Sequence, residues 1–258
     1  MILEHPAVGQ LRAVTETASV LLCDNPGIMT LEGTNTWILR GPGSAEFVVV
    51  DPGPDDDAHL ARIAELGTVA LVLISHRHGD HTDGIDKLVG STGAVVRSVG
   101  SGFLRGLGGP LTDGEVIDAA GLRITVLATP GHTADSVSFL LDDAVLTADT
   151  VLGRGTTVID SEDGSLRDYL ESLHRLAGLG GRRVLPGHGP ELPDIRDVTA
   201  MYLAHRRERL DQVRGALREL GEDAGARRIV EHVYTDVDEK LWDAAEKSVQ
   251  AQLDYLRS

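Results

Sequence analysis

One stretch of the sequence, residues 69–81, reads VALVLISHRHGDH. It joins an apolar run typical of a buried strand to three histidines and an aspartate. His76 and His78 are two positions apart, so in an extended segment their rings point to the same side. After a glycine, Asp80 and His81 can turn toward a second point. Imidazole nitrogens and carboxylate oxygens are usual ligands of zinc and related divalent metals, so this loop could hold two metal ions.

Three further segments repeat this placement of a metal ligand after an apolar run. His132 follows the run at residues 122–128, Asp149 ends the run that begins at Ala144, and His188 follows Val184-Leu185-Pro186-Gly187. A lone histidine is more often a surface or core residue than a ligand. Four ligand-bearing strand ends together indicate an active site built on loops at one edge of a rigid sheet.

The pattern His-x-His-x-Asp-His, followed by a distant His, Asp and His, resembles the metallo-β-lactamase superfamily over about residues 15–205. Within it, several stretches look like the β-lactamase-like protein 2 group. These stretches are residues 25–37, 51–53, 129–133, 153–157 and 186–190. The resemblance implies an α/β fold, a four-layer αββα sandwich with metals at one edge. It also implies a small, winged-helix-like C-terminal module.

The resemblance also assigns metal ligands. A first metal would be held by His76, His78 and His132, a second by Asp80, His81 and His188, and both would be bridged by Asp149. The implied cofactors are two Zn²⁺ ions, or other divalent metals. Members that hydrolyse β-lactams usually carry Cys at the bridging position, whereas hydrolases of phosphodiesters, thioesters and lactones carry Asp. The family name therefore does not indicate antibiotic hydrolysis here.

Two metals about 3.5–4 Å apart can share one hydroxide and stabilise developing negative charge. Asp80 is the candidate catalytic residue, because it could both ligate a metal and move a proton to the leaving group. Asp51 is a candidate for orienting a ligand histidine. It is equally well explained as the turn residue of Asp51-Pro52-Gly53.

Candidate substrate-binding residues fall in two places. Asn35, Thr156 and Thr157 lie in stretches shared with the resembled group. His205, Arg206 and Arg209 lie with Tyr202 on one face of an expected helix and could grip an anion in the cleft. A solvated or interface face is the alternative interpretation of this second set.

Composition narrows the class of protein. The chain has 258 residues and a formal net charge of −16, which disfavours generic nucleic-acid binding. No apolar run reaches the roughly 20 residues of a membrane span, so no membrane partner is expected. Residues 1–10 do not resemble a signal peptide. The single cysteine, Cys23, fits a reducing cytosol, so the expected location is cytoplasmic. The oligomeric state is left open.

Elements along the chain follow the same patterns. Residues 11–20 and 36–39 are expected strands, and a helix is expected between Ser165 and Gly178. Strands vanish after Pro193, which divides the chain into a catalytic domain at residues 1–204 and a helical module at residues 205–258. The sequence ends where the wing of a winged helix is expected, so the presence of a wing stays open.

Three functions remain at this point. The first, slightly preferred, is a phosphodiesterase acting on single-stranded RNA. The second is a thioesterase or lactonase of the glyoxalase II type, acting on a small-molecule ester. The third, a non-catalytic metal-binding protein, is disfavoured by the full ligand set. A basic track leading to the metals would favour RNA, and a narrow, neutral or aromatic-lined pocket would favour an ester. Few aromatic residues (3%) are available to stack bases.

Overall fold

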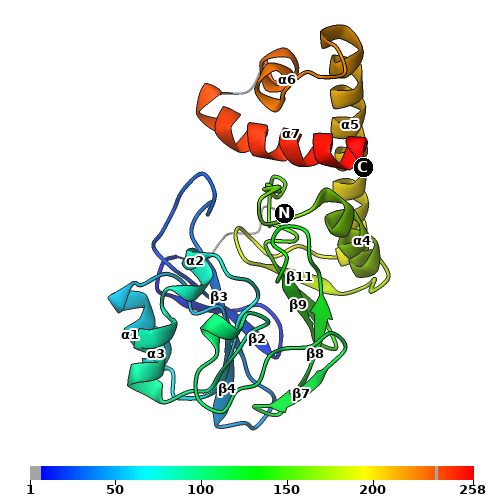
Figure 1. Ribbon diagram of the computed structural model, residues 1–258. Helices are drawn as coiled ribbons and strands as arrows, with labels where there is room; N and C mark the ends of the chain where they lie inside the picture. Colours follow the sequence, from blue (N-terminus) through cyan, green and yellow to red (C-terminus); the bar gives the residue numbers. More distant parts are fainter. Residues whose placement is uncertain (1–6, 236–237) are drawn as a thin grey trace.

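The computed structural model describes residues 7–235 and 238–258. Two β-sheets pack face to face, and helices cover the outer face of each sheet (Figure 1). A separate group of helices lies beyond one end of the sheets. The predicted four-layer αββα arrangement is thereby confirmed, with α1 and α3 on one outer face and α4 on the other.

The first sheet has six strands in sequential order. They are β1 (Leu11–Ala13), β2 (Ala18–Leu22), β3 (Asn35–Leu39), β4 (Glu46–Val50), β5 (Thr68–Leu73) and β6 (Val96–Arg97). The expectation of one strand over residues 11–20 was wrong, because β1 and β2 form a hairpin. Thr15 turns the chain between them, since its hydroxyl accepts hydrogen bonds from the backbone N–H groups of Thr17 and Ala18.

The second sheet has five strands in the order β11-β10-β9-β8-β7. They are β7 (Val116–Ala119), β8 (Leu122–Ala128), β9 (Val137–Leu140), β10 (Ala144–Ala148) and β11 (Arg183–Pro186). Each sheet is antiparallel at one end and parallel at the other. The parallel pairs are β4–β5 and β5–β6 in the first sheet and β10–β11 in the second.

Alternation along β4 shows how the layers form. Val48 and Val50 lie in the core between the sheets, which also contains Phe139 from β9. Phe47 and Val49 point the other way, toward the helices on the outer face. Successive side chains of a strand face opposite sides. An unbroken apolar run is therefore what a strand needs when it is covered on both faces.

Short helices flank the first sheet and one longer helix covers the second. They are α1 (Asp57–Glu65), α2 (Gly79–Thr82), α3 (Ile85–Thr92), the 3-10 helix η1 (Ser101–Phe103) and α4 (Leu166–Ala177). Ser165 caps α4 by accepting from the Asp168 N–H, and Gly178 follows its last residue, as the sequence predicts. Asp80 and His81 lie within α2.

The C-terminal helices are α5 (Ile195–Leu220), α6 (Ala226–Val233), the 3-10 helix η2 (Glu239–Leu241) and α7 (Trp242–Arg257). The described part of the chain contains no strand after β11. Helix α5 packs on α4 near its start and on α6 near its end, so it runs unbroken through the predicted boundary at residue 204. In the two described ranges, no helix is both long and apolar enough to cross a membrane.

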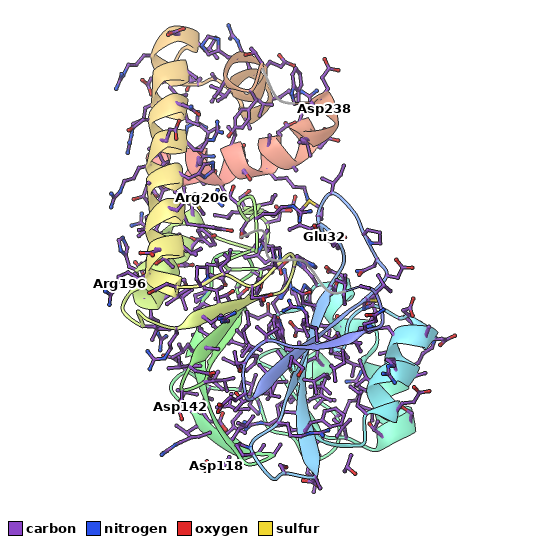
Figure 2. The ribbon with its side chains drawn as sticks, turned by 180° about the vertical axis from the view of Figure 1, so that it is seen from behind. Glu32, Asp118, Asp142, Arg196, Arg206 and Asp238 are labelled. Atoms are coloured by element: carbon purple, nitrogen blue, oxygen red, sulfur yellow. The ribbon has the colours of Figure 1, made fainter. Side chains whose placement is uncertain are left out.

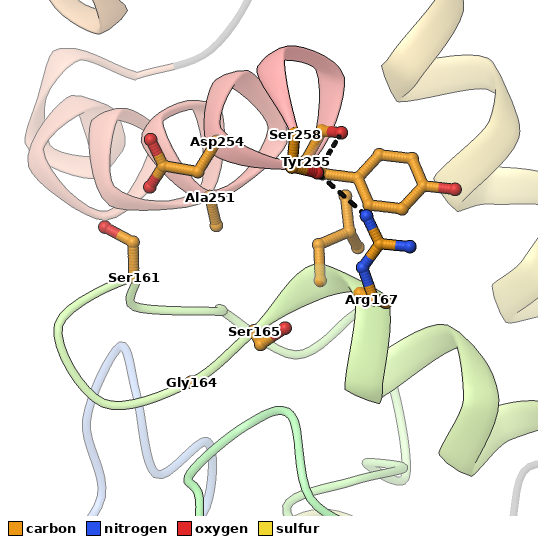
Figure 3. A pocket seen from close by; sticks show the side chains of 9 residues that line it. Ser161, Gly164, Ser165, Arg167, Ala251, Asp254, Tyr255 and Ser258 are labelled. Atoms are coloured by element: carbon orange, nitrogen blue, oxygen red, sulfur yellow. Dashed lines mark hydrogen bonds between the residues drawn. The ribbon is translucent and has the colours of Figure 1, made fainter.

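Helix α7 lies against the start of α4, and its contacts join the helical module to the sheets. The Arg167 guanidinium donates to the Ser258 hydroxyl at 2.8 Å and lies 5.5 Å from the Tyr255 ring (Figure 3). Lys247 also pairs with Asp160 at 2.6 Å. None of the predicted metal ligands lines the pocket at this seam.

A substitution at Gly131 can test how tightly α4 packs against the second sheet. Its φ is +133°, and an added Cβ would lie 2.3 Å from the Tyr169 Cα. We expect Gly131→Ala to lower the free energy of unfolding by about 2–4 kcal/mol, measured by urea denaturation. The control is Gly90→Ala in α3, where nothing lies within 4 Å and the backbone is helical. That control should be neutral or stabilising by up to about 1 kcal/mol. Equal unfolding free energies for the two variants would contradict this packing.

Candidate metal centre

The seven predicted ligands converge at one edge of the two sheets. His76, His78 and His132 offer nitrogens that all lie within 4.8 Å of one another, and Asp80, His81 and His188 form a second such group. Asp149 lies between the groups. Its carboxylate is 3.7 Å from His132 Nε2 on one side and 3.4 Å from His188 Nε2 on the other.

The sheet topology explains this convergence. Parallel strands end at the same edge, so residues that follow β4 and β5 meet, as do residues that follow β10 and β11. A bridge between Thr34 and His188 ties the first sheet to the second at this edge. Gly187 leaves room for the Asp149 carboxylate, because an added Cβ would lie 2.3 Å from Asp149 Oδ1.

Four of the histidines are held in the same way. Each Nδ1 lies within hydrogen-bond distance of a protein oxygen, and each Nε2 points to the common centre. The pairs are His76 with Ser75 Oγ at 2.9 Å, His81 with Asp51 Oδ2 at 2.9 Å, His132 with Val158 O at 2.9 Å and His188 with Gly33 O at 3.0 Å. The sequence predicts none of these acceptors except Asp51.

Asp51 connects the two ligand groups. Its carboxylate accepts from the Ser75 N–H and hydroxyl and from His81, and the same Ser75 hydroxyl accepts from His76. Asp51 and its neighbours could themselves be taken for a ligand group. A cation there would break these hydrogen bonds, so the geometry indicates an orienting role. Asp51 is therefore not only the turn residue of Asp51-Pro52-Gly53.

The donor set fits metal cations. Because each of these Nδ1 atoms is committed to a protein acceptor, a ring that gives up its Nε2 proton directs the Nε2 lone pair at the common centre. His76 Nε2 and His132 Nε2 each lie 3.1 Å from His78 Nδ1, and His81 Nε2 lies 3.3 Å from His188 Nε2. Asp149 Oδ1 is buried without a hydrogen-bond partner among the described residues. Cations at the centre would satisfy all of these atoms.

Electrostatics at the centre favour positive charge. Burial alone would raise the pKa of Asp149, but the charges of His188 and His81 hold it well below its ordinary value. Burial alone would lower the pKa of His188, but Asp149 and Asp80 raise it to about 9. The pKa of His76 lies well below its ordinary value because burial and the charge of His81 both disfavour a proton there.

The first set of predicted substrate residues lies close to the centre, but two of the three are buried. Asn35 is 1% exposed, and its amide donates to the carbonyls of Pro186 and Gly189. It therefore fixes the loop that carries His188, while direct contact of Asn35 with a substrate stays a prediction. Thr157 is also buried and donates to the Asp149 carbonyl, so it positions Asp149. Thr156 is half-buried and lines the cleft.

The second set divides between the core and the surface. Tyr202 and Arg206 are buried, with the Tyr202 hydroxyl on the Leu152 N–H and Arg206 donating to the Thr157 carbonyl. His205 and Arg209 are half-buried and line a pocket. The face of α5 that carries these four residues is therefore turned toward the cleft, as predicted. Within it, Tyr202 and Arg206 support the loop that carries Thr157.

Two adjoining hollows open beside the centre. The first, which we call the inner chamber, includes His132 and Asp149 in its lining and has a volume of about 220 Å³. Most of its wall is apolar and comes from three places: Ile28, Met29 and Leu31; Leu152 and Val158; and Leu241 before α7. No pattern in the sequence predicts this wall. The exposure of Ile28 and Met29 (62% and 53%) is a property of the fold alone.

The second hollow, the outer chamber, lies between the loop at residues 156–158, α5 and α7. It shares Thr156, Thr157 and Val158 with the inner chamber, as well as Leu241 and Ala244. His205 and Arg209 contribute to it from α5. The C-terminal helices therefore form part of the cleft wall.

Comparison with known proteins gives two family matches. Residues 29–188 match the model described as the metallo-beta-lactamase superfamily, and residues 226–258 match the beta-lactamase associated winged helix domain. The second match covers α6, η2 and α7. It confirms the predicted winged-helix-like module, while the division at residue 204 stays a prediction.

Individual proteins are similar over most of the chain. The beta-lactamase-like protein 2 homolog of Drosophila melanogaster is 30% identical over 97% of this chain and 90% of its own length. The lactamase-like protein vrtG of Penicillium aethiopicum is 32% identical over 82% of this chain and 69% of its own. A beta-lactamase domain protein from Burkholderia ambifaria shares the fold, with a TM-score of 0.84, 22% identity, and coverage of 99% and 90%.

The role of Asp51 generates a prediction about metal affinity. Asp51→Asn keeps the shape but removes the charge that orients His81 and, through Ser75, His76. We expect metal affinity to fall about 10- to 100-fold, measured by competition with a chromophoric chelator. Asp118→Asn, on an exposed position of β7, is the matched control and should bind metal like wild type. Unchanged affinity in Asp51→Asn would show that its carboxylate is not needed to aim the ligands.

Proposed function

Because the chain belongs to the metallo-β-lactamase superfamily and is a metal-dependent hydrolase, we propose that it cleaves an ester or thioester with an apolar acyl group. The single observation that carries this proposal is the lining of the inner chamber. Ile28, Met29 and Leu241 bring apolar surface directly beside the ligands His132 and Asp149. An apolar acyl group loses contact with water there at little cost.

The metal ligands would be the two groups of three residues with Asp149 between them, holding two zinc ions or another divalent metal. When bound, such a pair supplies Lewis-acid activation of the attacking water and of the scissile carbonyl. The chain's own residues supply orientation. Asp51 and Ser75 fix the rings of His81 and His76, and Thr157 holds the backbone of Asp149.

We assign Asp80 the transfer of a proton from water to the leaving group. Its carboxylate is 28% exposed, against 12% for Asp149 and 3% for Asp51, so it is the most accessible acid of the centre. His188 lies 3.2 Å from its Oδ2. Burial alone would raise the pKa of Asp80, but this hydrogen bond and the charge of His81 keep it below its ordinary value. Asp80 is therefore ionised at neutral pH and able to accept a proton.

A phosphodiesterase acting on single-stranded RNA is the second candidate. Arg206 and Arg209 favour it, because phosphate contacts come mainly from such side chains. Among the described residues that line the inner chamber, however, there is no Phe, Tyr or Trp to stack a base. The apolar wall therefore reverses the slight preference for RNA that the sequence suggested.

We expect about two metal ions per chain in protein purified without chelators, measured by elemental analysis. Asp149→Asn keeps the side-chain shape but lacks the charge placed between the two ligand groups. It should lower both metal occupancy and hydrolysis, the latter by about 100-fold. Full activity with two metals retained in this variant would contradict the bridging role of Asp149.

A substrate panel separates the two candidates. Metal-loaded protein should hydrolyse S-butyryl-N-acetylcysteamine and a medium-chain lactone, and prior treatment with a chelator should abolish turnover. Met29→Asp would place a charge in the apolar wall and should raise KM for the butyryl thioester at least about tenfold. Val116→Asp, at an exposed position of β7, is the control. Metal-dependent cleavage of single-stranded RNA without turnover of either ester would overturn the proposal.

A further inference from the structure

The outer chamber differs from the inner chamber in the positive charge of its lining. Figure 2 shows Arg206 on α5, where this helix passes from the sheets to the C-terminal helices. Arg206 and Arg209 both line the chamber, and its described lining residues include no Asp or Glu. In a chain with 40 acidic and 24 basic residues, a wall with two guanidinium groups and no carboxylate is locally electropositive.

Neither arginine has its charge neutralised by a described carboxylate. Arg206 donates to the Thr157 carbonyl and lies 5.0 Å from the Tyr169 ring. Arg209 donates to His205 and Gln212 and lies 5.0 Å from the Tyr234 ring. These contacts hold both guanidinium groups in place without cancelling their positive charge.

Three buried polar atoms that have no hydrogen-bond partner among the described residues belong to this same wall. They are His205 Nδ1, Arg206 Nε and Gln252 Oε1, and the side chains of Arg206 and Gln252 are only 4% and 2% exposed. Because Arg209 donates to His205 Nε2, the neutral ring of His205 carries its hydrogen on Nδ1. The wall therefore has two unused donors and one unused acceptor. Such atoms cost free energy unless a ligand satisfies them.

We propose that the outer chamber binds an anionic group, a phosphate or a carboxylate, carried by the leaving group of the substrate. The anion would face Arg209, Arg206 and His205, and a neighbouring hydroxyl or amide N–H of the substrate would donate to Gln252. The acyl group would occupy the inner chamber. The assignment of the anion to the leaving group rests on the proposed function. Anion binding in the outer chamber rests only on the charges and unpaired polar atoms of the chamber itself.

The first experiment measures binding directly and requires no turnover. Metal-loaded protein is titrated with pantetheine 4′-phosphate and, separately, with pantetheine, using calorimetry. We expect the phosphate to tighten binding at least about tenfold, the change that corresponds to roughly 1.4 kcal/mol. Arg209→Gln should remove this advantage, and Arg209→Lys, which keeps the charge, should retain part of it. The control is Arg214→Gln, an exposed residue of α5 paired with Asp211, which should match wild type.

Two outcomes of this titration would overturn the proposal. Equal affinity for pantetheine and its phosphate would show that the chamber does not recognise an anion. A phosphate-dependent affinity that Arg209→Gln leaves unchanged would place the phosphate elsewhere, for instance at the metals.

The second experiment uses turnover to distinguish phosphate from carboxylate. Butyryl-coenzyme A carries phosphates, S-butyrylglutathione carries carboxylates, and S-butyryl-N-acetylcysteamine is neutral. Arg209→Gln should raise KM about tenfold for the preferred anionic thioester, with little change in kcat and no change for the neutral one. If wild type hydrolyses none of the three, the proposed function fails while the titration still decides the anion site. If Arg209→Gln raises KM equally for all three thioesters, the role of Arg209 in anion recognition is overturned.

Discussion

The direction of four imidazole rings is the constraint on which the rest of this structure depends. Each Nδ1 is paired with an oxygen of the protein, so each Nε2 is aimed inward before any cation arrives. The acceptors come from distant parts of the chain: Gly33, Asp51, Ser75 and Val158. The two sheets must therefore be packed together before the ligands can converge. Metal affinity and folding are linked through this requirement.

Holding the predicted ligands in place requires unfavourable backbone conformations at two residues. Asp51 and Ala148 both have positive φ values, 54° and 44°, although neither is glycine. Asp51 orients two of the predicted ligands, His81 directly and His76 through Ser75, and Ala148 immediately precedes Asp149. Such conformations persist where the surrounding packing over-determines them, and they concentrate at functional sites. The buried valines of β4 and β5 supply that packing on both faces of the first sheet.

The C-terminal helices add the part of the cleft that the sheets do not provide. Leu241 completes the apolar wall of the inner chamber, and α5 and α7 enclose the outer one. Buried Arg206 links α5 to the candidate metal centre. Its guanidinium donates to the Thr157 carbonyl, and the Thr157 hydroxyl in turn donates to the Asp149 carbonyl. One helix thus couples the substrate wall to the position of a metal ligand. This arrangement makes the C-terminal helices part of the wall beside the candidate metal centre.

The sequence alone determined the fold class, the strands that flank the site and the seven residues that meet there. It could do so because apolar runs and strand-end ligands are local patterns, and parallel strands must end at one edge. Tertiary structure alone decided what surrounds them. Asn35 is a polar residue that the sequence placed at the substrate, yet it is buried, because the two carbonyls that it binds lie 151 and 154 positions away. The apolar inner chamber likewise exists only once Met29 and Leu241, from opposite ends of the chain, line the same hollow as His132 and Asp149.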